Sequence, residues 1–216
     1  MLRNESPVVN GLGSGPVSGK RDLSGLSHFC DIKRSVQMTT APNNAEVATR
    51  FASVAREFCS VIDSAPNLDR IELLAQVYRI LPQLIGEAIS LPNIELGEDE
   101  SQEEENRKSQ ARARFRLSDA QWGQLYEFLK VKLGDLNLYW KVWDPTKDNE
   151  AIHGSLADDF ADIYRDLKEG LNVGEAHQAL PEDNIWHWRF GYYSHWGKHA
   201  IDALRTIHFL LEEMLS

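Results

Sequence analysis

The sequence predicts an all-α protein: a single helical bundle of about five helices, preceded by a disordered N-terminal tail. Apolar residues recur every three or four positions through most of residues 44–215, which is the period of a helix with one buried face. Helix-capping residues stand at the expected starts of several of these segments, and only residues 136–145 look extended. With 42% hydrophobic and 26% charged residues, the 216-residue chain has the composition of a soluble globular protein.

The first 43 residues differ from the rest of the chain. They are rich in Gly, Ser, Pro and Asn and show neither helical nor strand periodicity. Such a segment buries too little apolar surface to offset its ordering entropy, so we expect a disordered tail. In a second interpretation Met38 is the true start of the protein, which would place residues 1–37 outside the translated chain. Residues 44–215 then form the helical domain.

Two helices are expected in the first half of this domain. The first begins near Asn44, a candidate N-cap, and ends at Pro66. The second runs from about residue 68 to residue 90. Pro82 is expected to kink it, because proline lacks a backbone donor and clashes with the preceding turn.

Residues 95–116 form a charged linker in which an acidic run is followed by a basic cluster. The basic residues are Arg107, Lys108, Arg112, Arg114 and Arg116. Because the two charge blocks are adjacent, we expect a self-neutralising, solvated linker. The whole chain has a formal net charge of −10, and this acidic balance argues against a nucleic-acid partner.

The third helix is expected to open at the capping box formed by Ser118 and Gln121 and to end at Gly134. The aromatic stretch at residues 136–145 is expected to be a short strand or a packed loop. Ser155 then caps a fourth helix, whose inward stripe ends near Leu171.

The last helix, residues 182–215, is expected at the centre of the bundle. Wound at 100° per residue, it has two unlike faces. The face expected to join the core carries Trp186, Phe190, Tyr193, Gly197, Ile201, Leu204, Ile207 and Leu211. The opposite face carries Trp188, Tyr192, His195, His199, Asp202 and Thr206.

The polar residues of that second face suggest a metal site. His195, His199 and Asp202 are four and three residues apart, so they lie on one side of the helix. The fourth helix offers Asp159, Asp162 and Asp166, and if it packs antiparallel to the last helix, two of these carboxylates could approach the histidines. Such a set could hold a divalent metal for a hydrolase or oxygenase reaction. The alternatives are a buried hydrogen-bonded network, which is the commoner role of polar core groups, and a small-ligand pocket.

Four aromatic residues are candidates for lining a ligand pocket: Trp188, Tyr192, Trp140 and Trp143. Tryptophan is common in pockets and interfaces because it combines a large area with a polar N–H group. Packing within the core is the alternative. Trp140 and Trp143 fit that alternative less well, because they fall in an expected connector and could cover the Trp188/Tyr192 face.

Several classes of protein are disfavoured. The chain has only two cysteines, no apolar run long enough to span a bilayer and no secretory signal pattern, so we expect a cytoplasmic protein. Cys59 has no neighbouring histidine, and Ser194 lacks the Gly-x-Ser-x-Gly context of a nucleophile. The glycines at residues 11–15 do not follow a strand, which excludes a phosphate-binding loop there.

Three motifs are specific enough to suggest a family. They are the segment from Gly154 to Gly170 that contains Asp-Asp-x-x-Asp-Ile-Tyr-x-Asp-Leu, the pattern Trp186-x-Trp-x-Phe, and His195-Trp-Gly-Lys-His199-x-x-Asp202. Over about residues 44–213 the chain resembles a bacterial all-helical family catalogued as a domain of unknown function. The resemblance implies the helical fold and no particular activity.

We therefore favour a non-catalytic interaction or accessory protein with a protein partner, and self-association into a homo-oligomer is compatible with the same features. The acidic balance, the lack of a known catalytic signature and the aromatic residues support this hypothesis. The alternative is a metal-dependent or small-ligand-binding helical enzyme with a His/Asp site on the last two helices. No cofactor is predicted, apart from the divalent metal of that alternative.

Overall fold

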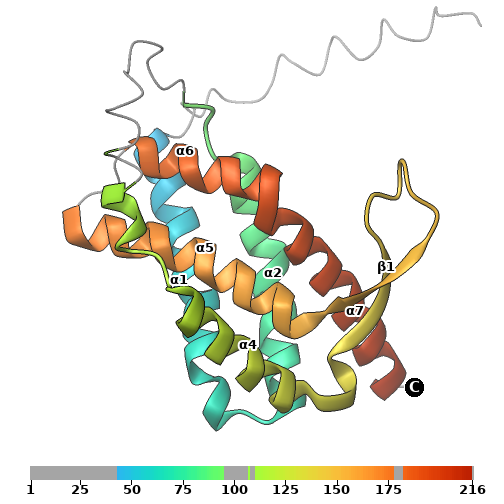
Figure 1. Cartoon of the computed structure of the whole chain (residues 1–216). Helices are drawn as coiled ribbons and strands as arrows, with labels where there is room; N and C mark the ends of the chain where they lie inside the picture. The colour runs from blue at the N-terminus through green and yellow to red at the C-terminus, as the bar shows by residue number, and fades with distance from the viewer. Residues whose placement is uncertain (1–42, 95–106, 108–109, 178–181, 216) are drawn as a thin grey trace, which may run out of the picture. The chain divides into compact units, whose positions relative to one another are not determined.

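The computed structural model describes residues 43–94, 107, 110–177 and 182–215 (Figure 1). The predicted tail and the acidic part of the charged linker lie outside the described residues. The regular secondary structure of the described residues is helical except for one two-stranded sheet, which confirms the predicted all-α fold class.

The first two helices are held at their N-termini by side-chain caps. Helix α1 (Asn44–Ser64) is capped by Asn43, one residue before the expected Asn44. A short 3-10 turn, η3 (Ala65–Asn67), leads to α2 (Arg70–Ser90), where Asp69 and Glu72 form a capping box. Pro82 lies inside α2, whose helical assignment continues through it, and its side chain is exposed.

Helix α4 (Asp119–Leu133) begins at the predicted capping box and ends at Gly134, which has a φ of 59° that favours glycine. The turn η4 (Gly134–Leu136) then leads into strand β1 (Leu138–Val142). This strand pairs antiparallel with β2 (Ala151–Ser155), so that Val142 lies opposite Ala151. Of the two alternatives for residues 136–145, the strand is therefore right.

Helix α5 (Leu156–His177) follows β2 directly, and the Ser155 hydroxyl accepts a hydrogen bond from the Asp158 N–H at 3.3 Å, as a cap. It packs against α1, α4, α6 and α7, and Figure 1 shows it crossing the middle of the bundle. The prediction that the last helix occupies the centre was wrong. The centre is α5, because it has neighbouring helices on several sides.

The last helical segment consists of α6 (Glu182–Gly191), a π-helical turn η5 (Tyr192–Trp196) and α7 (Gly197–Leu215), which follow one another without a break. In the π turn the Gly197 N–H donates to the carbonyl oxygen of Tyr192, five residues earlier.

The predicted core face of this segment was right for Leu204, Ile207 and Leu211, which are buried or packed against the core, and wrong for several earlier residues. Phe190, Tyr193 and Ile201 are 55%, 61% and 52% exposed. The buried face consists of Ile185, Trp188, Tyr192, Trp196, Ala200, Ala203 and Ile207. The two faces have similar apolar content, and a uniform winding of 100° per residue does not allow for the wider π turn.

The end of the predicted charged linker belongs to the folded domain. The Arg112 Nε atom lies 2.6 Å from Glu169 Oε1 of α5, and Asn172 of α5 donates a hydrogen bond to the carbonyl oxygen of Phe115. This differs from the expectation of a solvated linker, because α5 supplies a counter-charge from 57 residues further along the chain.

Candidate functional site

The side chains predicted to form a metal site meet between α5 and the π turn and first part of α7. Asp158, Asp159, Asp162 and Asp166 succeed one another at intervals of one to four residues along one side of α5. His195 and His199 come from the facing segment, and their ring centroids are 5.2 Å apart. His195 therefore contacts Asp166, 29 residues earlier in the sequence, and His199 contacts Asp159, 40 residues earlier.

Each histidine uses its Nδ1 atom to contact a carboxylate. His195 Nδ1 lies 2.7 Å from Asp166 Oδ2, and His199 Nδ1 lies 2.8 Å from Asp159 Oδ1. Because an ionised carboxylate only accepts hydrogen bonds, these contacts place a proton on each Nδ1. In the neutral rings, the Nε2 atoms then carry the free lone pairs.

Both Nε2 atoms face the same oxygen. His195 Nε2 lies 3.8 Å and His199 Nε2 lies 3.6 Å from Asp162 Oδ2. These distances are too long for direct hydrogen bonds. One ligand atom from each of these three residues lies within 4.8 Å of the other two, as expected for ligands that surround one point.

The other oxygen of Asp162 is held by two donors. Trp122 Nε1 of α4 and Arg165 Nη2 of α5 each lie 2.9 Å from Asp162 Oδ1. Hydrogen bonds to one oxygen of a carboxylate fix its plane and direct the second oxygen. Neither Trp122 nor Arg165 was among the predicted site residues. The Trp122 contact joins α4 to α5 across 40 residues and follows from no local spacing, whereas Arg165 and Asp162 are an i,i+3 pair within α5 that the sequence does show.

Burial makes negative charge costly here. Asp159 is 1% exposed, and this desolvation raises its pKa, although hydrogen bonds from His199 and the Tyr139 hydroxyl act in the opposite direction. The Tyr139 hydroxyl donates to Asp159 Oδ2 at 2.7 Å. Burial and the neighbouring Asp162 carboxylate also raise the pKa of Asp158. A cation held by these groups would offset the cost of their burial.

Asp158 was not among the predicted ligands. Together with Asp159 and His199 it forms a second group of close ligand atoms, which shares His199 with the first group. The signal was present in the sequence, since Asp158 precedes Asp159 at the start of α5, but its position there matches a favourable charge near a helix N-terminus.

The structure does not bring Asp202 together with the other predicted ligands. Its Oδ2 atom lies 2.9 Å from Lys141 Nζ of β1, and no group of close ligand atoms found among the described residues contains it. A spacing of three residues places Asp202 on the same side of the helix as His199. The ion pair with the hairpin, which lies far away in sequence, turns its carboxylate elsewhere.

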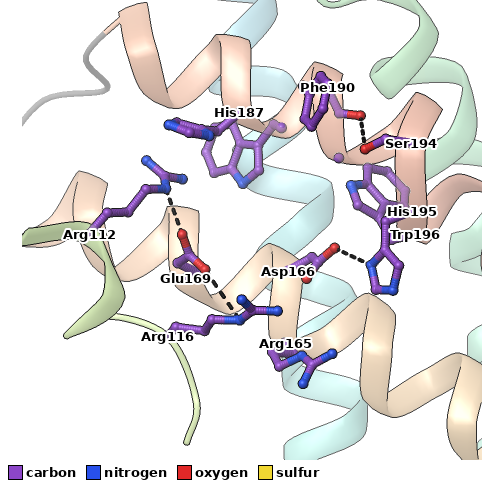
Figure 2. A pocket seen from close by; sticks show the side chains of 12 residues that line it. Arg112, Arg116, Arg165, Asp166, Glu169, His187, Phe190, Ser194, His195 and Trp196 are labelled. Atoms are coloured by element: carbon purple, nitrogen blue, oxygen red, sulfur yellow. Dashed lines mark hydrogen bonds and ion pairs between the residues drawn. The ribbon is translucent and has the colours of Figure 1, made fainter. Parts of the chain in front are cut away.

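The four aromatic candidates do not assemble into one pocket. Trp188 and Tyr192 are buried in the core, where Trp188 packs 4.9 Å from the ring of Phe51. Trp140 and Trp143 are 64% and 61% exposed on and beyond β1, so they do not cover the Trp188/Tyr192 face. Trp188 borders the hollow shown in Figure 2, whereas Trp140 borders a different one, together with Leu138 and Phe209.

Cys59 is also unsuited to act as a nucleophile. It is 2% exposed on α1, and burial raises the pKa of its thiol to about 12. The thiolate is therefore scarce near neutral pH, which agrees with the sequence-based expectation that this cysteine is not catalytic.

Two histidines and one or two carboxylates form a ligand set used by zinc and by non-haem iron(II). Three protein ligands leave coordination positions for water or a substrate, which is the feature of catalytic sites rather than closed structural ones. A metal in such a site can lower the pKa of bound water or polarise a carbonyl or phosphoryl oxygen.

Comparisons with known proteins support the fold and the predicted family resemblance. The family model described as Domain of unknown function (DUF5063) matches residues 42–213. The chain is also similar to the crystal structure of protein BF1032 from Bacteroides fragilis, a structural-genomics target. The identity is 23% and the TM-score is 0.60, and the match covers 76% of this chain and 92% of that chain. The search of curated proteins found no match. Among the described helices, none is long and apolar enough to cross a membrane.

Proposed function

We propose that this chain, which belongs to the DUF5063 family of domains of unknown function, is a divalent-metal-binding helical protein. The metal ligands in this proposal are Asp162, His195 and His199, and Asp158 is the candidate fourth ligand. The observation that carries the proposal is the approach of two Nε2 atoms to one oxygen of Asp162 at 3.6 and 3.8 Å.

The roles of the two nitrogens in each ring support this assignment. Histidine ligands of metals almost always donate their other ring N–H to a carboxylate, a backbone carbonyl or water. His195 and His199 do so to Asp166 and Asp159. A purely structural network would be expected to show direct contacts on both sides of each ring, at about 2.7–3.2 Å. Here the Nδ1 contacts are direct and the Nε2 contacts are not.

The spacing also fits a metal. Zinc binds histidine nitrogens and carboxylate oxygens at about 2.0–2.2 Å, which separates two ligands by roughly 3.4 Å at the tetrahedral angle. The observed separations of 3.6 and 3.8 Å need only a few tenths of an ångström of side-chain movement to meet this geometry. The alternative considered from the sequence was a metal-dependent or small-ligand-binding helical enzyme. The geometry favours metal binding at its His/Asp site over the interaction protein that the sequence favoured.

The test is metal stoichiometry in the tag-free, full-length protein. After removal of metal with a chelator, the protein is equilibrated with Zn²⁺, Mn²⁺ or Fe²⁺ (the last without oxygen) and analysed by mass spectrometry and calorimetry. We expect one strongly bound equivalent of at least one metal. His199→Ala and Asp162→Asn should lower the affinity by at least about tenfold, because each removes a ligand.

Asp202→Asn is the matched control, because Asp202 lies on α7, like His199, and pairs with Lys141 instead of facing the site. It should bind metal like the wild type. Circular dichroism establishes that each variant is folded. If the wild type binds none of the three metals, or if the ligand variants bind as tightly as Asp202→Asn, the proposal is wrong.

A second candidate function is association with a protein chain, which the sequence analysis favoured. Its specific support is an exposed apolar surface formed by Leu138, Trp140 and Phe209, which are 61%, 64% and 55% exposed and line a hollow of about 220 Å³. Sedimentation velocity tests self-association at this surface. A Trp140→Ser/Phe209→Ser variant should shift any wild-type oligomer to monomer. Trp143→Ala, an exposed tryptophan outside the hollow, should not, and a monomeric wild type would count against self-association.

A further inference from the structure

A second feature of the molecule is a hollow of about 310 Å³ that adjoins the candidate metal site, because His195 and Asp166 line it (Figure 2). Three arginines line it: Arg112 and Arg116 lie in the segment before α4, and Arg165 belongs to α5. Figure 2 shows these guanidinium groups on one side and Phe190, Ser194, His195 and Trp196 on the facing side.

The two arginines before α4 are fixed in place by α5 and α6. Arg112 Nε lies 2.6 Å and Arg116 Nε lies 3.8 Å from the carboxylate of Glu169, and Arg112 Nη2 donates to Asn184 Oδ1 at 2.8 Å. Glu169 is therefore the counter-ion of two guanidinium groups. Asp166, the other acidic residue of the lining, pairs with His195. Arg165 Nη2 lies 2.9 Å from Asp162 Oδ1 of the candidate metal site, so each of the three arginines has a carboxylate partner.

The unpaired donors of the described residues gather at this hollow. Four buried side-chain polar atoms lack a hydrogen-bond partner, and all are N–H donors of residues that line it: Arg112 Nη1, Arg165 Nε, Trp188 Nε1 and Trp196 Nε1. An unmet buried donor costs about 1–3 kcal/mol, so such groups call for an explanation. Trp188 Nε1 lies against Gly170, which leaves three donors for the hollow.

We infer that the hollow binds the phosphate group of a small molecule. Its three remaining unpaired donors come from three different elements, namely the segment before α4, α5 and the π turn. A planar carboxylate is usually satisfied by one arginine through two parallel hydrogen bonds. A phosphate has three strong acceptor oxygens that point in different directions, which suits donors arranged around it. The planar guanidinium group of arginine presents its donors in a rigid arrangement that matches the oxygens of a phosphate.

The hollow leaves room for an organic part beside the phosphate. Phe190 is 55% exposed at its edge, and Gly191 gives access to Trp196, because a Cβ atom there would lie 3.2 Å from Trp196 Nε1. This inference does not rest on the metal proposal. The two sites share His195 and Asp166 as neighbours, so a phosphate bound here would lie next to a metal bound there.

The experiment titrates inorganic phosphate into the full-length, metal-free protein, followed by calorimetry and by the indole N–H signals in NMR spectra. We expect saturable binding of one phosphate and a shift of the Trp196 indole signal. Arg112→Lys and Arg165→Lys keep the charge but remove guanidinium donors, so each should weaken binding by about tenfold or more. Arg50→Lys is the matched control, because Arg50 pairs with Glu87 on the α1–α2 surface.

Three results would overturn the inference: no saturable phosphate binding, equal binding by the Arg112, Arg165 and Arg50 variants, or equally tight binding of acetate. If Arg112→Lys does not fold, Arg165→Lys decides the question, because Arg112 also holds Glu169 and Asn184. Since no metal is present in the titration, failure of the metal proposal would leave this result unaffected.

Discussion

At the scale of single residues, the two oxygens of Asp162 have different neighbours. Oδ1 accepts hydrogen bonds from Trp122 and Arg165, whereas Oδ2 faces the Nε2 atoms of His195 and His199. The donors fix the carboxylate so that its second oxygen is directed at the two imidazoles. Each imidazole is fixed by its own carboxylate in turn. The candidate ligands are thereby oriented by partners that do not themselves reach the central point, which favours a pre-organised site.

Substitution of Gly170 tests how closely α5 and α6 must pack against each other. A Cβ atom at Gly170 would lie 2.1 Å from Nε1 of the buried Trp188, which has no room to move in the core. We therefore expect Gly170→Ala to lower the free energy of unfolding by about 1–3 kcal/mol, as overpacking does. Urea denaturation measures the change.

Gly86→Ala is the control for this prediction. Gly86 is also a helical glycine, but a Cβ atom there would meet nothing within 4 Å. This substitution should raise the free energy of unfolding by about 0.5–1 kcal/mol, because alanine is the better helix former. Equal effects of the two substitutions would show that the contact with Trp188 does not restrict the packing of α5 against α6.

At the scale of elements, the features that depend on neighbouring residues could be predicted from the sequence. The capping box at Ser118 and Gln121, the stop at Gly134 and the cap at Ser155 are local patterns, and the structure contains all three. The pairing of His195 and His199 with carboxylates of α5 could also be predicted, because both helices repeat these residues at intervals of three or four.

The features that depend on distant residues could not be predicted in the same way. The π turn at Tyr192–Trp196 changes which residues face the core after it, and the spacing of the apolar residues there does not predict a π turn. Uniform winding therefore assigned Phe190 and Tyr193 to the core, although both are exposed. Arg112 was assigned to a solvated linker because its partner Glu169 lies 57 residues away. Asp202 was assigned to the metal site because Lys141, which holds it, lies on the hairpin.

At the scale of the whole molecule, an acidic chain with a formal net charge of −10 buries carboxylates at its centre. Asp159 and Asp162 are 1% and 7% exposed, and burial raises the pKa of Asp159 and of the neighbouring Asp158. A carboxyl group whose pKa is higher in the folded than in the unfolded state costs stability once the pH exceeds its unfolded value. In the metal-free protein, ionisation of Asp158 and Asp159 near neutral pH therefore destabilises the fold.

The pH dependence of stability tests the pairing of His195 with Asp166. The hydrogen bond to Asp166 raises the pKa of His195, so this pair stabilises the fold fully below the unfolded value of 6.5 and ceases to do so as the pH rises through the folded pKa. It should make the metal-free protein more stable to urea at pH 6 than at pH 8. The share of His195 should be below about 1 kcal/mol, because its side chain is 36% exposed to screening solvent. Asp166→Asn should remove that share, and Asp202→Asn should keep it.

With saturating metal the pH trend of stability should reverse, since the ligands must lose their protons to bind the metal. A metal-free protein that gains stability from pH 6 to pH 8 would contradict the assignment.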